Sequence, residues 1–226
     1  MKYTAIIIEP RKHAAIEFVL KNALKCLSDE WSIVFFHGNH NGDYVRDIVK
    51  DLDRIQLVHL PVDNLTLMEY SELLASRSVV YDYATEVFLI FQTDSMIFEE
   101  NKELINDFLE YDYVGAPWLR CNFFITIACN FIGNGGFSLR RKSKMLEIID
   151  NIKWYQLNED LYFSTNYDGI LVKKPEYEKA MTFSVEAIYS DVTFACHKPW
   201  AENHYPQFKS RYPEVDILRS LQYIIQ

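Results

Sequence analysis

The residue best placed for chemistry is Asp94, which follows the apolar run Val87–Phe91 after two polar residues. Five consecutive apolar residues predict a strand buried on both faces, as strands of a parallel sheet are. Ligands of open α/β sheets bind beyond the carboxyl ends of the strands, so Asp94 stands where a site is expected. A metal site is one interpretation of this carboxylate, and a solvated turn or a helix cap is the other.

A second candidate is the glycine-rich segment 132–140, which contains Asn134, Gly135 and Gly136. Glycine allows the backbone to approach a ligand closely or to adopt a positive φ angle. A tight turn explains the segment as well as a binding loop does. A phosphate-binding loop is disfavoured, because the segment does not end in Gly-Lys-Ser or Gly-Lys-Thr.

Adjacent carboxylates and a late histidine complete the reactive residues. Glu159 and Asp160 suit the first turn of a helix, where the helix dipole favours acidic side chains, but one of them also suits a general base. The imidazole of His197 suits Mn²⁺ when a carboxylate is nearby, although a hydrogen-bonded structural histidine is the alternative. Lys198 is able to bind a phosphate, and Trp200 is able to form one side of a binding site.

Alternating strands and helices must position these residues. The apolar pattern predicts strands at 4–8, 32–36, 55–60 and 87–91, with helices at 12–27, 45–52, 65–75 and 76–84. This order predicts an α/β fold with a mostly parallel, Rossmann-type central sheet flanked by helices. A further helix is expected around Leu104 and Phe108, and the apolar segment 123–129 suits a covering strand or a flap. Glu9-Pro10-Arg11 replaces the Gly-x-Gly of a dinucleotide site, which argues against dehydrogenases.

Charge and cysteine usage narrow the classes of partner. The formal net charge of −9 argues against nonspecific binding to nucleic acid or to an anionic membrane. The longest basic run, at 140–142, is expected to open a helix. Four cysteines at irregular intervals make a zinc knuckle or a disulfide scaffold a poor explanation, and reduced thiols favour a cytoplasmic protein.

The chain is expected to form one domain over residues 1–226, because no linker, repeat or low-complexity segment interrupts it. No apolar stretch approaches the roughly 18 residues that a membrane-spanning helix needs. The first strand begins so early that no signal peptide is expected.

Taken together, the motifs resemble those of nucleotide-sugar glycosyltransferases of the GT-A fold. The order is that of Asp-x-Asp, Gly-Gly-x-Ser, Glu-Asp and histidine in the beta-1,4-galactosyltransferases, with these counterparts: Thr93-Asp94-Ser95, Gly135-Gly136-Phe137-Ser138, Glu159-Asp160 and His197. His197–Trp200 also resembles the Lys-Pro-Trp ending of glycogenin-like retaining transferases. From Tyr3 to Trp200 the chain resembles a poorly characterised glycosyltransferase-like family of microbes and large viruses, through the segments 91–95, 114–118, 133–136 and 158–160.

The resemblance implies a donor site and a metal site. Asp94 and His197 would bind Mn²⁺ or Mg²⁺, and Thr93, Asp94 and Lys198 would hold the diphosphate of a UDP- or GDP-sugar. Ile8, Glu9 and Arg11, at the end of the first strand, are placed to hold the base and ribose. The first carboxylate of Asp-x-Asp is Thr93 here, which puts metal binding in question.

The resemblance also implies an acceptor site in the second half of the chain, about 99–226, after a nucleotide-facing half of about 1–98. Asp160, or Glu159 beside it, would be the base. The remaining candidates are expected to bind substrate, either with a side chain that faces the glycan or with a backbone that lies close to it: Trp118, Asn134, Gly135, Gly136 and Trp200.

The sequence therefore predicts a metal-dependent glycosyltransferase that moves a sugar to a hydroxyl of a glycan or another acceptor, with inversion. Two alternatives stay open: a catalytically inactive sugar-binding module of the same fold, and a retaining transferase of glycogenin-like type. A nucleotidyltransferase is disfavoured, because no basic glycine-rich loop follows the first strand.

Overall fold

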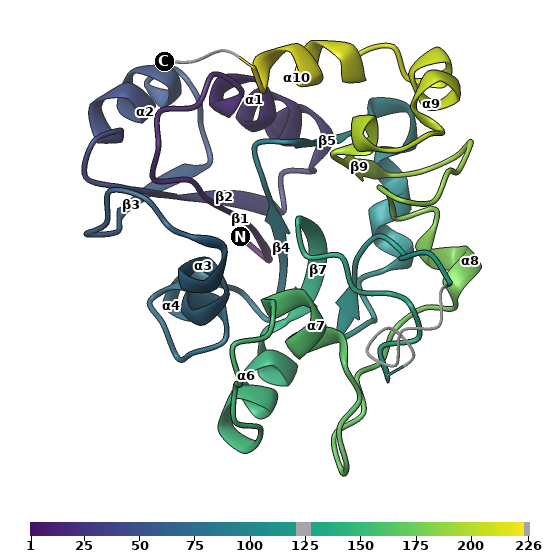
Figure 1. Ribbon diagram of the computed structural model, residues 1–226. Coiled ribbons are helices and arrows are strands. Elements are labelled where there is room, and N and C mark those ends of the chain that lie inside the picture. The colour runs from purple at the N-terminus through teal and green to yellow at the C-terminus, as the bar shows by residue number, and fades with distance from the viewer. Residues whose placement is uncertain (121–127, 224–226) are drawn as a thin grey trace.

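The main sheet carries most of the architecture. The computed structural model of the protein describes residues 1–120 and 128–223. In this part of the chain the main sheet has the strand order β3-β2-β1-β4-β7-β6, and a small sheet has the order β5-β9-β8 (Figure 1). The strands are β1 (Tyr3–Ile8), β2 (Trp31–His37), β3 (Ile55–His59), β4 (Val87–Phe91), β5 (Ser95–Ile97), β6 (Tyr113–Val114), β7 (Phe137–Arg141), β8 (Ser184–Val185) and β9 (Ala195–His197).

The first four strands of the main sheet run parallel, as the sequence predicts. β1 pairs with β2 on one side and with β4 on the other, and β2 pairs with β3. β7 then adds antiparallel to β4, and β6 adds antiparallel to β7. The expected mostly parallel α/β sheet is confirmed, and chain order reverses direction between β1 and β4.

Both faces of this sheet are covered, which explains the continuous apolar strands. Along β4, Leu89 and Phe91 pack into one hydrophobic cluster, whereas Phe88 and Ile90 pack into another on the opposite face. Successive side chains of a strand point to opposite faces, so two cores require an unbroken apolar run.

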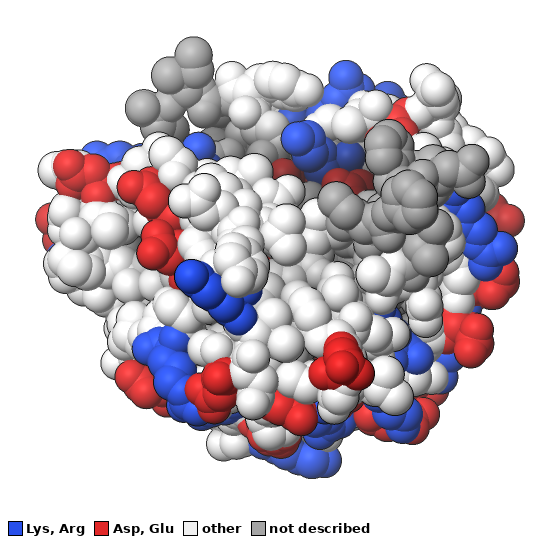
Figure 2. Space-filling view, turned by 60° about the horizontal axis from the view of Figure 1, so that its bottom comes forward, with Lys and Arg blue, Asp and Glu red and all other residues white. Residues whose placement is uncertain are grey.

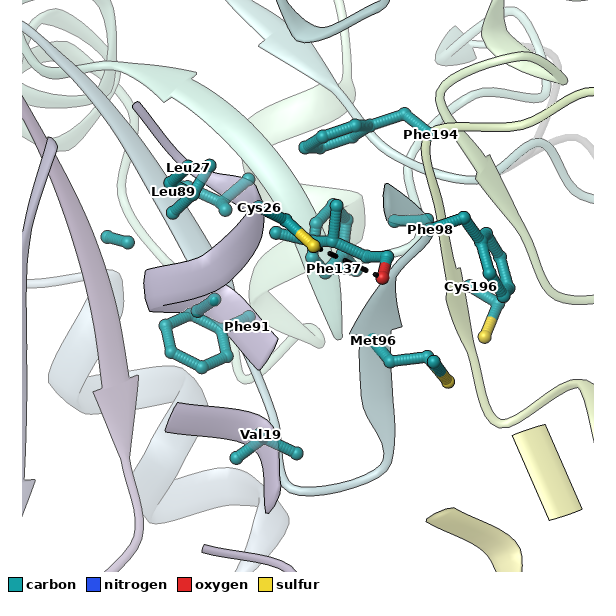
Figure 3. Close-up of a cluster of buried hydrophobic side chains, with 14 of the residues drawn as sticks. Val19, Cys26, Leu27, Leu89, Phe91, Met96, Phe98, Phe137, Phe194 and Cys196 are labelled. Carbon is teal, nitrogen blue, oxygen red and sulfur yellow. Dashed lines mark hydrogen bonds between the residues drawn. The ribbon is translucent and has the colours of Figure 1, made fainter. Parts of the chain in front are cut away.

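The first cluster lies between the main sheet, the small sheet and several helices (Figure 3). In Figure 3, Cys26 of the first helix donates a hydrogen bond to the Ile97 carbonyl of β5, which ties the helix to the small sheet. The helices that contribute buried residues to this cluster are α1 (Ile16–Cys26), α2 (Gly42–Val49), the 3-10 helix η1 (Glu99–Asp107), α9 (Tyr205–Arg211) and α10 (Val215–Leu221).

Four helices contribute buried residues to the second cluster: α3 (Leu67–Leu74), α4 (Val80–Tyr83), α6 (Lys142–Asn151) and α7 (Glu159–Ser164). Of these, α3 and α7 border the candidate site. α8 (Tyr177–Ala180) and the 3-10 helix η2 (Pro199–Ala201) connect later segments. A capping box starts α3: Thr66 accepts from the Glu69 amide, and Glu69 accepts from the Thr66 amide. This cap fixes the loop before α3, which lines the site.

The structure differs from the sequence expectations in three places. The basic run at 140–142 does not open a helix as a unit: Arg140 and Arg141 end β7, and α6 begins at Lys142. The strand β7 was not predicted at all. Of the segment 76–84 only Val80–Tyr83 is helical, and most of the expected covering strand at 123–129 lies outside the described residues.

Charged side chains of both signs are mixed on the surface (Figure 2). Figure 2 shows Lys and Arg side chains interspersed with Asp and Glu on the face that it draws, without a continuous basic area. Within residues 1–120 and 128–223, no helix is long and apolar enough to cross a membrane.

Candidate functional site

A pocket of about 200 Å³ opens at the carboxyl ends of β1 and β4. This is the point where strand order reverses direction, the usual position of ligands in open α/β sheets. The pocket, called the first pocket below, brings together residues of three segments: Ile8, Glu9, Pro10, Arg11, Asn64, Leu65, Thr66, Leu67, Tyr70, Gln92, Thr93 and Asp94. The residues at and just after the ends of β1 and β4 that were predicted to bind the nucleotide therefore all line this pocket. The contribution of the α3 segment was missed.

Glu9 and Arg11 form the polar wall of the first pocket. The carboxylate of Glu9 is buried and accepts from the Arg11 backbone amide at 2.9 Å and from both Nε and Nη2 of its guanidinium at 2.8 Å. Such bidentate pairing fixes both side chains in one geometry. Carboxylate oxygens retain acceptor capacity in such a pair, so Glu9 is still able to accept from a ligand hydroxyl.

A second pocket, of about 140 Å³, shares Leu67, Tyr70 and Gln92 with the first. Its other lining residues come from α3, the glycine segment, the start of α7 and the end of β9: Ser71, Asn134, Gly135, Gly136, Asn158, Glu159, Asp160 and His197. The structure thus unites the glycine segment, the paired carboxylates and the histidine in one cavity, beside the pocket that contains Asp94.

Asp94 and His197 meet where the two pockets adjoin. Antiparallel pairing of β5 with β9 sets Ser95 opposite His197, and the Lys198 amide donates to the Asp94 carbonyl at 2.9 Å. As a result, Asp94 Oδ1 lies 3.2 Å from His197 Nε2. Lys198 adopts a left-handed backbone with φ of 47°, which is unusual for a residue with a Cβ.

The second nitrogen of the His197 ring faces a carboxylate that sequence reasoning missed. Glu186 Oε1 lies 3.2 Å from His197 Nδ1. Parallel pairing of β8 with β9 sets Val185 opposite Cys196, so the next residues along both strands are neighbours. No motif marks Glu186, and only its position just after a short strand could have pointed to it.

The electrostatics of this cluster favour the charged forms of both His197 and Asp94. Burial alone would lower the pKa of His197, but Asp94 and Glu186 outweigh it and raise the pKa to about 10. Burial alone would raise the pKa of Asp94, yet His197 and Lys198 bring it below its ordinary value. The isolated protein therefore holds an imidazolium between two carboxylates.

The Asp94–His197 pair also fits one divalent cation. Two ligands at right angles, each about 2.1 Å from an ion, are about 3 Å apart, close to the separation of Oδ1 and Nε2. Asp94 Oδ1 and His197 Nε2 are buried and make no hydrogen bond of good geometry. Among the described residues, no group of three or more His, Cys, Asp or Glu side chains is arranged around a common metal position. A cation here would need ligand oxygens from a substrate or from water.

The acidity of Asp160 in the second pocket is strongly altered. Burial, and then the nearby charge of Glu159, raise its pKa from 3.8 to about 7. It lies in the first turn of α7, as expected, and Oδ1 accepts from the Leu161 amide at 2.7 Å. A carboxylate with this pKa is half ionised near neutral pH and is well matched to accept a proton.

Glu159 contacts the protein core as well as the pocket. Its Oε2 lies 2.6 Å from Nη1 of Arg140, whose guanidinium is fully buried between the rings of Tyr113 and Phe163. The ion pair gives Glu159 a structural task that the sequence did not reveal. Its expected role as the alternative base stays a prediction.

The glycines of the segment provide room for side chains of the site. A Cβ on Gly135 would lie 2.3 Å from Oε1 of Glu159, and a Cβ on Gly136 would lie 2.2 Å from Nε2 of His197. Both distances are far below van der Waals contact. Neither glycine has a positive φ angle. Proximity to a sugar stays a prediction for both residues, which do line the second pocket.

The two tryptophans and Lys198 are not among the residues that line either pocket. Trp118 is half-buried, and its ring packs against Gly133. Trp200 packs against the first hydrophobic cluster. Lys198 is exposed, and its charge acts on Asp94. Thr93 lines the first pocket, and its carbonyl accepts from Gln222 of the C-terminal segment at 2.9 Å.

Solved structures show what class of fold carries this site. The chain is similar to galactosyltransferase LgtC in complex with donor and acceptor sugar analogs, with a TM-score of 0.55, 11% identity, and coverage of 99% of this chain and 98% of that one. It is also similar to mannosyltransferase PcManGT from Pyrobaculum calidifontis in complex with GDP-Man and Mn²⁺ (TM-score 0.52, 11% identity). That match covers 72% of this chain and 50% of the mannosyltransferase, so the chain spans half of its length.

These likenesses, at low identity, establish the fold: the chain has the GT-A fold found in nucleotide-sugar glycosyltransferases. No curated protein matches the chain in sequence. The model of one family matches residues 54–198, more than half of the chain. The chain belongs to this family, DUF5672, which is described as a protein family of unknown function.

Proposed function

We propose that the chain is a metal-dependent glycosyltransferase that moves a sugar from a nucleotide-sugar donor to a hydroxyl of a glycan or another acceptor. The observation that carries this proposal is the Asp94–His197 pair at the junction of two pockets, with Asp160 in the second. A sugar bound across this junction would have its diphosphate on one side and a base on the other.

The first pocket suits the nucleotide. Its position at the ends of β1 and β4, together with the polar Glu9–Arg11 wall, supports binding of a base and ribose. GDP-Man and Mn²⁺ are bound in the mannosyltransferase of the same fold, which favours a UDP- or GDP-sugar and Mn²⁺ or Mg²⁺ for this chain.

The Asp94–His197 pair would hold the cation, and Lys198 would not be one of its ligands. When bound, the ion would act as a Lewis acid on the diphosphate leaving group. Lys198 would add a positive charge next to that leaving group, and the left-handed backbone at this residue keeps its amide bound to Asp94.

Asp160 would supply the base. A sugar hydroxyl is a weak nucleophile, so a group must take its proton as the new C–O bond forms. With a pKa of about 7, Asp160 is ionised at mildly alkaline pH and is still basic enough to accept that proton. A single displacement driven by Asp160 inverts the configuration of the anomeric carbon.

The test is a panel of UDP- and GDP-sugars, measured by thermal shift with and without Mn²⁺ and then by turnover. A donor at a hundred times its Kd should stabilise the protein by about 2.7 kcal/mol. An anomeric proton signal of inverted configuration in the product is the expected result, and a retained configuration would favour the glycogenin-like alternative.

One observation favours a second candidate, a sugar-binding module without catalysis. Thr93 stands where the first carboxylate of Asp-x-Asp is expected, and the described residues offer no group of three or more His, Cys, Asp or Glu side chains that could hold a metal. Stabilisation by a donor with neither transfer nor hydrolysis of any sugar would support this module.

A further inference from the structure

The ring of His197 is held between two carboxylates that differ in their surroundings. Asp94 contacts Nε2 and Glu186 contacts Nδ1, both at 3.2 Å. Asp94 lines the first pocket, whereas Glu186 lines neither pocket. Nε2 therefore faces a carboxylate of the first pocket, and Nδ1 faces a carboxylate outside both pockets.

Glu186 is itself fixed by the glycine segment. Asn134 donates a hydrogen bond from Nδ2 to Oε2 of Glu186. The Oδ1 atom of Asn134 accepts from the Gly136 amide at 3.2 Å, so the orientation of its side-chain amide is set by the backbone. The missing Cβ of Gly136 leaves space for the ring of His197. One continuous chain of contacts therefore runs from Gly136 through Asn134 and Glu186 to His197.

We infer that Glu186 is the positioning residue of the metal site: it accepts the Nδ1 proton of His197 and directs Nε2 toward Asp94 as a metal ligand. A histidine that binds a metal usually donates its other ring proton to a carboxylate or carbonyl, which fixes the tautomer and makes the ligand nitrogen more basic. The inference rests on the proposed function, because it assumes a cation beside Asp94.

The assignment of roles follows from the contact between Glu186 and Asn134, because neither ring nitrogen of His197 makes a hydrogen bond of good geometry to its carboxylate. Oε2 of Glu186 is engaged by Asn134, so this carboxylate is bound to the scaffold. Asp94 Oδ1 is buried without a hydrogen bond of good geometry and is the oxygen at the pocket junction. Asp94 is thus the carboxylate that is available to a cation.

Glu186→Gln tests the inference with little change in volume. The amide of Gln has one oxygen, but Asn134 Nδ2 and His197 Nδ1 both need an acceptor, and the Gly136 amide holds Asn134 in its present orientation. One donor must lose its partner. Glu176→Gln is the matched control, because Glu176 is exposed and its side chain does not cap α8.

The first measurement is the Kd of Mn²⁺ alone, which is obtained from the EPR signal of the free ion. The second is the nitrogen coupling of the bound Mn²⁺, which is obtained by ESEEM. Glu186→Gln is expected to weaken binding by roughly 10- to 100-fold and to reduce the imidazole nitrogen coupling, whereas Glu176→Gln should leave both unchanged. Melting curves without Mn²⁺ check that the variants fold. If Glu186→Gln should not fold, Asn134→Ala, which removes the support of Glu186, must give the same loss in the same assay.

The outcomes separate the two proposals. Wild-type binding of Mn²⁺ with the same Kd and the same nitrogen coupling in Glu186→Gln would overturn the role of Glu186 and leave the glycosyltransferase proposal standing. A wild-type protein that binds no Mn²⁺, either alone or together with a UDP- or GDP-sugar, would overturn both the role of Glu186 and the metal dependence of the proposed transfer.

Discussion

Replacement of Asp160 by Asn gives opposite changes in rate and in stability, and the two together test the proposed base. The variant keeps the size of the side chain and an oxygen that is able to accept from the Leu161 amide, but it removes the basic oxygen. General-base assistance is typically worth roughly 10²- to 10⁴-fold, so the transfer rate should fall by that order. Donor affinity should hardly change, because Asp160 lies in the second pocket.

At alkaline pH, Asp160→Asn should be more stable than the wild type. The folded protein raises the pKa of Asp160 from 3.8 to about 7, so between these values the folded state binds more protons than the unfolded state. The contribution of Asp160 to the unfolding free energy of the wild type therefore falls as pH increases from about 4 to 7 and then levels off. The difference corresponds to at most about 4 kcal/mol, at about 1.4 kcal/mol per pKa unit.

The assay combines urea denaturation at pH 5 and pH 8 with the pH profile of kcat/KM. In the wild type, kcat/KM should rise toward a plateau above about pH 7, and Asp160→Asn should lose this rise. Asp168→Asn, at an exposed position, serves as the control and should change neither property. Undiminished turnover in Asp160→Asn would refute the assignment of the base, and an unfolding free energy with the same pH dependence as the wild type would refute the raised pKa.

Four further variants test the metal site and the buried ion pair. Asp94→Ala should abolish Mn²⁺-dependent nucleotide binding, and His197→Ala should weaken it; calorimetric titration with wild-type affinity in either variant would contradict its role as a ligand. Gly136→Ala should also lose Mn²⁺ affinity, since its Cβ would lie 2.2 Å from Nε2 of His197, and an unchanged Kd would show that the ring is able to move. Glu159→Gln leaves the fully buried Arg140 without a counter-charge, so it should lower the unfolding free energy, measured by urea denaturation, by about 3–5 kcal/mol. A loss of transfer rate with an unchanged unfolding free energy would contradict the structural role of this ion pair.

The part of the site built on parallel strands could be predicted from the sequence. The run Val87–Phe91 is apolar without interruption because both faces of the strand are buried, and this pattern located Asp94 correctly at the end of β4. The same reasoning located Glu9 and Arg11 at the end of β1, beside it. Local apolar periodicity is sufficient for such elements, because their burial depends little on which distant segment covers them.

The strand β7 and the partner of His197 could not be predicted in this way. Arg140 lies in the middle of the core, and only its pairing with Glu159, 19 positions further along the chain, makes that burial tolerable. Glu186 becomes part of the site only through the register of β8 with β9. Both features depend on contacts between distant segments, about which a local pattern of residue types carries no information.

The glycine segment shows how the same residues support two interpretations from the sequence alone. Gly135 and Gly136 suggest a backbone close to a ligand, but in the structure each one faces a side chain of the site, Glu159 or His197. The absence of a Cβ therefore fixes where the carboxylate and the imidazole lie, and through them the shape of the second pocket. Since Thr93 contributes no second carboxylate, the cation would depend on the exact position of the His197 ring. The constraint at Gly136 and the contact from Glu186 are what hold it there.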